Sequence, residues 1–336
     1  MIKEAINKLI NEEDLTFIEI REVFDEILSG LANEAQISSF LTALKSKKIT
    51  TDELLGAIVS SRDSFKFQQF GLNFSDGLES IAFDDKNEYI DILLAIDLIC
   101  SANNLSVSRY DFNSFSNKNK SFEILKTLGV NLEKNIDFLS NDFEKLNFSY
   151  FYLSQDIPYF KYSEKIRNTL PFDNILNITS KMLNPLKTKN LFLGICDKNL
   201  VETYANIALR LENNNSIIVC NDNIPFVSLS GESIVAEAWK NKIFTYVITP
   251  DLLGFKENDI NELKCSDIRE NANSLLNIMD NKLKNSMYDF IVLNSALALY
   301  ISKKSDSIME GIELAKKTID TGKMKEKFLQ IKNFYL

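Results

Sequence analysis

The sequence predicts an α/β protein in which a small helical N-terminal domain precedes a larger α/β domain with a central, mostly parallel sheet. Three observations predict this fold. Three short capped helices follow one another from Thr16 to about Val59, apolar strands then alternate with helices, and the last hundred residues are helical. A chain of 336 residues can bury roughly three quarters of its unfolded surface, enough for one large or two smaller domains.

Helix-capping signals define the N-terminal domain. Thr16 and Glu19 form a capping box at the start of one helix, Asn33 opens a second, and Thr50 with Glu53 caps a third. Each helix carries apolar residues at helical spacing and therefore has one face to bury. The pattern alone leaves two alternatives open: the faces pack on one another, or they also pack on a partner.

The α/β domain begins after residues 65–80, which lack clean periodicity and contain two glycines, so we interpret them as a hinge. Residues 88–104 are apolar nearly all round and predict a buried helix. Residues 105–109 predict a short strand. Residues 122–130 predict a helix closed by Gly129.

Further strands are expected at 146–154, 190–196 and 216–221, with a helix between the last two. The alternating segments 233–239 and 243–249 predict an antiparallel addition to the sheet. We therefore expect a helical domain over 1–66, completed by about 160–185, and an α/β domain over 67–159 and 186–336.

Residues 109–130 carry a pattern that points to a known family. They resemble, without gaps, the KHGNRxxSxKxGSxxxLxxLGV pattern of anthranilate phosphoribosyltransferases. The matching positions are Ser116, Lys118, Ser121, Leu125, Leu128, Gly129 and Val130. The N-terminal and C-terminal helices are also similar to those of the family. The resemblance implies the two-domain fold, a homodimer through the helical domain, and phosphoribosyl transfer from phosphoribosyl diphosphate (PRPP) with Mg²⁺.

The chemical part of the family pattern is altered. The family's GTGGDG loop falls on Ile81, Ala82, Phe83, Asp84, Asp85 and Lys86, and only Asp85 is kept. Glycines in a phosphate loop allow positive φ and bring amide N–H groups close to the anion. Ile81 and Phe83 cannot do this, and Asp84 adds a like charge. Asp84 and Asp85 could instead cap the apolar helix that follows them.

The metal and anion residues are altered as well. The family's Mg²⁺-binding acidic pair falls on Pro225 and Phe226, which offer no side-chain oxygen. Asp222 could replace the pair only through a small alignment gap, and is otherwise a turn residue. Arg109, Lys118 and Lys120, together with Ser116, could form a rebuilt anion site or belong to a solvated loop.

The family residues around the acceptor are partly conserved in type in this sequence. Arg167 falls on the family arginine implicated in anthranilate binding, and Asn177 falls on the asparagine of the RTxFN motif. The arginine of that motif falls on Asp173. The resemblance therefore assigns Arg167 and Asn177 to a small anionic or aromatic ligand.

Composition excludes several classes of function. The chain has no histidine, so the usual general base and metal ligand are absent. A net charge of −9 disfavours binding to nucleic acid, for which the lysines of the last helices are the sole candidate patch. The four cysteines form no CxxC pair, and we interpret them as reduced core thiols. With no signal peptide and no apolar run of roughly 18 residues, we expect a cytoplasmic protein away from membranes.

Three hypotheses follow. The first is a diverged homologue that has lost productive PRPP and Mg²⁺ binding and acts as a non-catalytic binding or regulatory protein without a cofactor. The second is an active phosphoribosyl or glycosyl transferase of the tryptophan-biosynthesis type, using Mg²⁺ and a rebuilt anion site. The third is a nucleic-acid-binding paralogue.

Overall fold

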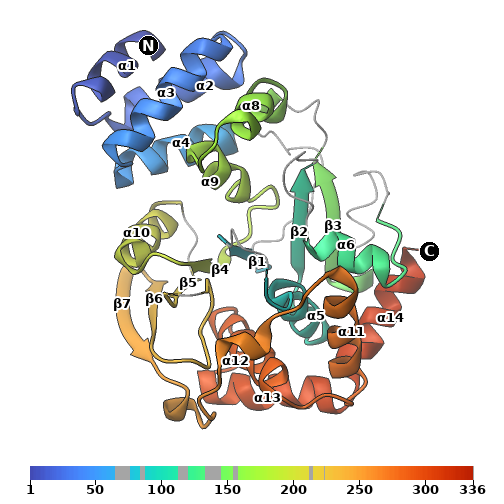
Figure 1. The fold of residues 1–336 in the computed structure, drawn as a ribbon. Coiled ribbons are helices and arrows are strands. Elements are labelled where there is room, and N and C mark those ends of the chain that lie inside the picture. The colour runs from blue at the N-terminus through green and yellow to red at the C-terminus, as the bar shows by residue number, and fades with distance from the viewer. Residues whose placement is uncertain are drawn as a thin grey trace. The chain divides into compact units, whose positions relative to one another are not determined.

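Figure 1 shows the fold in a computed structural model, which describes residues 1–64, 76–83, 88–112, 120–132, 145–153, 158–211, 215–222 and 224–335. The chain forms two compact units. The first contains the described residues of 1–71, 111–117 and 152–187. The second contains those of 72–110, 118–151 and 188–336.

The first unit is helical. Its helices are α1 (Ile2–Ile10), α2 (Phe17–Leu28), α3 (Glu34–Lys47), α4 (Thr51–Ser64), α8 (Pro158–Thr169) and α9 (Ile175–Lys181). The three predicted capped helices are confirmed as α2, α3 and α4. Both capping-box bonds are present between Thr16 and Glu19, and Thr50 exchanges hydrogen bonds with Glu53. Helix α1 was not predicted.

The apolar faces of these helices pack on one another. Helix α2 packs on α4, and α1 packs on α3. Gly56 allows the first contact, because a Cβ there would lie 2.8 Å from the carbonyl oxygen of Phe17. The buried face of α2 includes Val23, Phe24 and Ile27, all of which are fully buried. The helices therefore bury their apolar faces against one another, which is one of the two arrangements that the sequence left open.

The second unit is built on a seven-stranded mixed sheet in the order β3-β2-β1-β4-β5-β6-β7. Its strands are β1 (Leu78–Ala82), β2 (Val107–Phe112), β3 (Phe148–Leu153), β4 (Asn190–Ile195), β5 (Asn215–Cys220), β6 (Ser233–Trp239) and β7 (Lys242–Ile248). Strand β1 pairs in parallel with β2 and β4, and β4 with β5. Strands β6 and β7 add antiparallel. The predicted fold class is confirmed.

Helices cover both faces of this sheet. They are α5 (Ile92–Ala102), α6 (Lys120–Thr127), α10 (Val201–Arg210), α11 (Ile268–Met279), α12 (Ser286–Ile301), α13 (Ile308–Asp320) and α14 (Lys323–Phe334), with short 3₁₀ turns at Lys198–Leu200, Asp251–Leu253 and Ile260–Leu263. Helix α12 is buried along nearly its whole length and packs on β4, β5 and α5. On the other face, α10 packs on β5 and β6.

Two predictions need correction. Strand β1 starts at Leu78, so the last residues of the segment interpreted as a hinge belong to the sheet, and residues 65–75 lie outside the described chain. Helix α5 starts at Ile92 and not near residue 88. The backbone before Ile92 forms hydrogen bonds with a distant segment and not within a helix, since the Ile90 N–H donates to the Leu263 carbonyl at 2.9 Å. Asp91 then caps the helix by accepting from the Leu94 N–H at 3.0 Å.

The cysteine prediction holds in part. All four thiols are free, and Cys100 and Cys220 are buried as expected. Cys196 is exposed and Cys265 is half-buried, so the expectation of core positions is wrong for them. In the described part of the chain, no helix is long and apolar enough to cross a membrane.

Candidate functional site

The carboxyl ends of β1, β4 and β5 share one edge of the sheet, the place where parallel sheets bind ligands. At the end of β1, Ile81 is 7% exposed and pairs with Leu193 of β4. The Phe83 N–H donates to the Gly194 carbonyl at 2.9 Å, and the Phe83 ring lies 5.5 Å from that of Tyr204. None of the residues 81–83 has positive φ. These positions continue the sheet, so the Phe83 amide is not directed at an anion.

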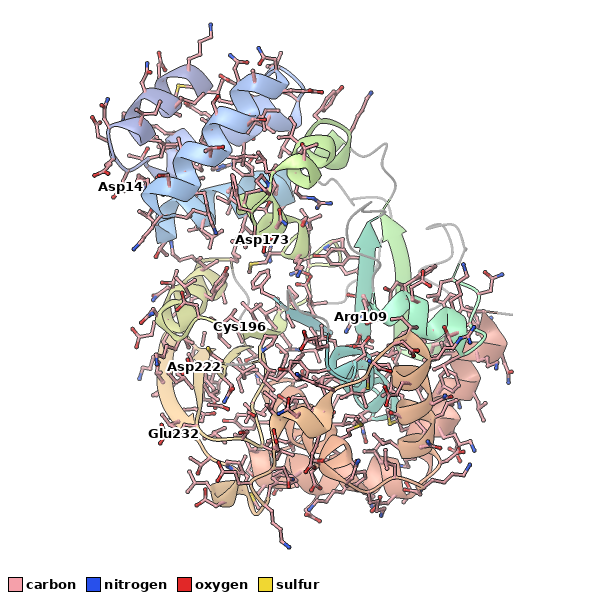
Figure 2. The ribbon with its side chains drawn as sticks, in the orientation of Figure 1. Asp14, Arg109, Asp173, Cys196, Asp222 and Glu232 are labelled. Carbon is pink, nitrogen blue, oxygen red and sulfur yellow. The ribbon has the colours of Figure 1, made fainter. Side chains whose placement is uncertain are left out.

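Arg109, one of the candidate anion-binding residues, lies inside the second unit (Figure 2). Its guanidinium forms an ion pair of 2.6 Å with Asp97 of α5 and donates to the Ser80 hydroxyl at 3.0 Å. Ser80 in turn donates to Asp97 at 2.7 Å. Both charged side chains are buried, at 9% and 2% exposure. The charge of Arg109 is therefore neutralised within the protein.

The electrostatics of this pair follow from its burial. Burial raises the pKa of the Asp97 carboxyl, and the neighbouring Arg109 opposes that rise. Burial acts to lower the pKa of Arg109, but the attraction to Asp97 outweighs it and the pKa lies above its usual range. We assign the pair as ionised, because three hydrogen bonds hold the two charges together.

The family's polar run after the glycine loop falls on the start of α5. Leu94 is fully buried, and Leu93 packs against the core. Asp91 accepts a hydrogen bond of 2.5 Å from Ser121, one of the residues that matches the family pattern. Ser121 is thus bonded to a helix cap. Ser116, Lys118, Asp84 and Asp85 lie outside the described residues.

The positions of the family's Mg²⁺-binding pair are apolar in structure as well as in sequence. The Phe226 ring is buried and lies 6.4 Å from Phe192 and 5.9 Å from Phe290. Pro225 packs against β4 so closely that a Cβ on Gly194 would lie 1.8 Å from its carbonyl oxygen. These residues belong to the core of the second unit and do not fit a Mg²⁺ ion.

Asp222 does not replace that pair in the described structure. Its side chain is exposed and lies 3.5 Å from the Lys198 ammonium group. Figure 2 shows Cys196 just after the carboxyl end of β4 and Asp222 just after that of β5. The described residues contain no group of three or more Cys, Asp or Glu side chains that could hold a metal ion. Burial raises the pKa of the neighbouring Cys220 thiol to about 12, so this thiol is protonated at neutral pH.

The acceptor residues lie in the first unit, on two helices that contact each other. Arg167 is buried near the end of α8. Asn177 lies in the first turn of α9, and its amide donates to Asp173 at 2.8 Å. The amide oxygen of Asn177 and the amide nitrogen of Asn174 are buried without a hydrogen-bond partner among the described residues. Buried polar atoms of this kind are uncommon and suit a polar ligand.

The protein comparisons agree with this architecture. The glycosyl transferase family a/b domain matches residues 84–325, and the glycosyl transferase family helical bundle domain matches residues 3–64. Anthranilate phosphoribosyltransferase from Ruminiclostridium cellulolyticum is 30% identical over 339 residues, which cover 100% of this chain and 98% of that protein. The chain belongs to the anthranilate phosphoribosyltransferase family. The enzyme from Lacticaseibacillus casei is also 30% identical, over 99% of this chain and 97% of its own.

Solved structures of the family share the fold. Anthranilate phosphoribosyltransferase from Thermus thermophilus has a TM-score of 0.87 at 21% identity, covering 98% of this chain and 99% of its own. The enzyme from Saccharomyces cerevisiae, in complex with PRPP and Mg, has a TM-score of 0.82 at 19% identity, covering 99% and 97%. The similarity therefore spans nearly the whole of both chains.

Sequence reasoning missed Asp97, the residue that determines what Arg109 does. A signal was available: Asp97 is a lone carboxylate within the apolar run of α5, and a buried carboxylate needs a partner. The neighbouring strand offered Arg109, but the sequence does not say which side chain faces which. Gly194 was missed too, since only the packing of Pro225 reveals that the position has no room for a side chain.

Proposed function

We propose that the chain is a transferase of the anthranilate phosphoribosyltransferase type. The supporting observation is 30% identity to curated enzymes of that name over essentially the whole of both chains. The reaction would join the amine nitrogen of an aromatic acceptor to the anomeric carbon of PRPP, with release of diphosphate and one proton. Because the chain has no histidine, that proton would pass to a carboxylate or to water.

In such a transferase the acceptor would bind to the first unit. Arg167 would attract the carboxylate of the acceptor, and Asn177 would offer its buried amide oxygen to the acceptor's polar group. The anion site must be rebuilt, because Arg109 is neutralised by Asp97 and the Phe83 N–H bonds to Gly194. Lys118, Lys120 and Ser116 are the remaining candidates from the sequence.

A second candidate function rests on those same observations. The chain would bind a small anionic or aromatic ligand, without a cofactor, and would transfer nothing. This candidate is favoured by the aromatic core at Phe226, the sheet pairing of residues 81–83 and the internal ion pair of Arg109. Full-length similarity supports the first candidate, and the geometry of the described anion region supports the second.

One experiment separates the two. The thermal stability of the pure protein is measured with PRPP plus Mg²⁺, with PRPP alone, and with anthranilate alone. A ligand at a hundredfold excess over its Kd adds about 2.7 kcal/mol of stability. A Mg²⁺-dependent shift with PRPP, followed by consumption of anthranilate, is expected for the transferase. A shift with anthranilate alone, and none with millimolar PRPP, is expected for the binding protein.

Matched variants test the acceptor residues. Asn177→Ala should abolish the shift caused by anthranilate, whereas Asn206→Ala, an exposed asparagine of α10, should leave it unchanged. A shift that survives Asn177→Ala would refute the assignment of this residue. If neither ligand stabilises the protein, both candidate functions fail for these ligands.

We also propose that the helical unit forms a homodimer. A groove of about 580 Å³ between α1 and α3 is lined mostly by apolar and small polar side chains, among them Leu9 and Ala43, and also by the charged Glu12 and Lys47. Ile10 at its edge is 67% exposed. Light scattering should give twice the chain mass, and Ile10→Lys should reduce it to one chain mass. A single chain mass for the unmodified protein would refute the proposal.

A further inference from the structure

The outermost strand of the sheet, β7, has the features of a pairing edge. It is seven residues long and lies at the end of the strand order. Phe244 is 51% exposed and Val247 is 46% exposed. Its single charged residue, Lys242, is at its first position, and it has no proline. Exposed edge strands usually carry protecting charges or prolines, because their unpaired backbone groups recruit other strands. Strand β7 has little such protection.

The backbone pattern of the hairpin shows which groups are directed outward. Strands β6 and β7 are joined by Lys240 and Asn241, both with positive φ, and Trp239 pairs with Lys242. In a two-residue hairpin this flanking pair exchanges hydrogen bonds, and bonded pairs then alternate along the ladder. The N–H and C=O groups of Ile243, Thr245 and Val247 are therefore directed away from β6. No backbone group of the described residues is bonded to them.

We propose that β7 pairs antiparallel with β7 of a second copy of the chain, about a two-fold axis at Thr245. The two sheets then join edge to edge. Ile243 of each copy pairs with Val247 of the other, and the two Thr245 residues pair with each other. A two-fold interface must be self-complementary, and this register meets that condition.

The side chains suit this register. On one face, Ile243 meets Val247 on either side of the Thr245 pair. On the other face, Phe244 lies opposite Tyr246 of the second copy. Aromatic pairs, β-branched pairs and threonine pairs are the cross-strand combinations that stabilise antiparallel sheets. The exposed apolar surface of Phe244 and Val247 is covered in the process.

The charges near the strand ends are complementary. Lys240 and Lys242 lie at the start of β7, and Asp251 follows its end. Antiparallel pairing brings the lysines of one copy towards Asp251 of the other. One charge opposes the pairing: Glu202 of α10 lies 3.5 Å from the Thr245 hydroxyl, so the two Glu202 side chains approach each other at the axis. The pairing should strengthen when this charge is removed.

The test is the mass of the full chain by sedimentation equilibrium from about 5 µM to 1 mM, since an interface of one strand pair is small and weak. If the chain is otherwise a monomer, the mass should double with concentration. If the helical unit already forms a dimer, the mass should at least double, because each dimer then presents two β7 edges. Trp239, the single tryptophan of the chain, lies beside the hairpin turn and is 40% exposed, so its emission should shift to the blue over the same range.

Variants locate the interface. Thr245→Pro removes an outward N–H but breaks no hydrogen bond between β7 and β6. Phe244→Lys places a charge in the contact. In each variant the mass should stay at its low-concentration value at all concentrations. Met309→Lys, on α13 at 50% exposure, is the matched control and should associate as the unmodified chain does. Glu202→Gln should lower the concentration of half-association several-fold.

Two results would overturn the proposal. A mass that stays constant up to 1 mM would exclude a second copy as the partner, leaving this edge to a strand of another protein. A rise that persists unchanged in both Thr245→Pro and Phe244→Lys would place the association on another surface.

Discussion

Replacing Asp97 with asparagine tests the internal ion pair most directly. The change keeps the size of the side chain but removes the carboxylate that lies 2.6 Å from the buried Arg109 guanidinium. The arginine cannot lose its proton and has almost no access to water, so its charge is left uncompensated. Breaking one side of a buried pair costs about 3–5 kcal/mol. Because the new amide oxygen can still accept one hydrogen bond, we expect a loss of about 3 kcal/mol.

The assay is urea unfolding followed by Trp239 fluorescence, which reports on the second unit because Trp239 lies within it. Glu313→Gln, in the same unit, is the control: Glu313 pairs with Lys316 at 3.5 Å, but it is 75% exposed, and such pairs contribute about 0–1 kcal/mol. The double variant Asp97→Leu with Arg109→Met should recover most of the loss, since it buries no charge. A loss below about 1 kcal/mol for Asp97→Asn would refute the buried pair.

Three further predictions concern stability. Gly194→Ala should lower the free energy of unfolding by about 1–3 kcal/mol, because the new Cβ would overlap the Pro225 carbonyl. Unchanged urea unfolding would show that the strand can move aside. Thr16→Ala should cost about 1 kcal/mol by removing the cap of α2, measured as the loss of helical circular dichroism on heating, and Thr42→Ala on the exposed side of α3 should cost less. Two lysines hold the pKa of Asp280 near 2, below its ordinary 3.8. Its stabilisation is therefore present above pH 4 and is lost as the pH falls towards 2, so Asp280→Asn and the unmodified chain should differ slightly at pH 6 and converge at pH 2.

The two candidate functions put different demands on the described residues. A transferase needs an anion site, and the described end of β1 offers a paired strand where the family pattern has glycines. A binding protein needs only the polar atoms around Asn177 and the positive charge of Arg167. The ligand titrations compare these demands directly, and the Asn177→Ala variant shows whether the same residues serve either function.

The sequence by itself determined the parts of this protein that depend on local patterns. The capping box at Thr16 and the cap residue Asn33 indicated the starts of α2 and α3, because a cap depends only on residues within one helical turn. Apolar runs identified β4 and β5, and alternation identified β6 and β7. The resemblance over residues 109–130 indicated the family, which the full-length comparisons confirmed.

Tertiary structure decided what the polar residues do. Arg109 carries the same charge in any setting, but its role depends on Asp97, twelve residues away and on another element. Phe226 is only an apolar substitute in the sequence, whereas the fold places it between Phe192 and Phe290. The start of α5 was misjudged because residues 88–90 bond to a segment more than 170 residues away. Such contacts join distant parts of the chain, and no local pattern of residues encodes them.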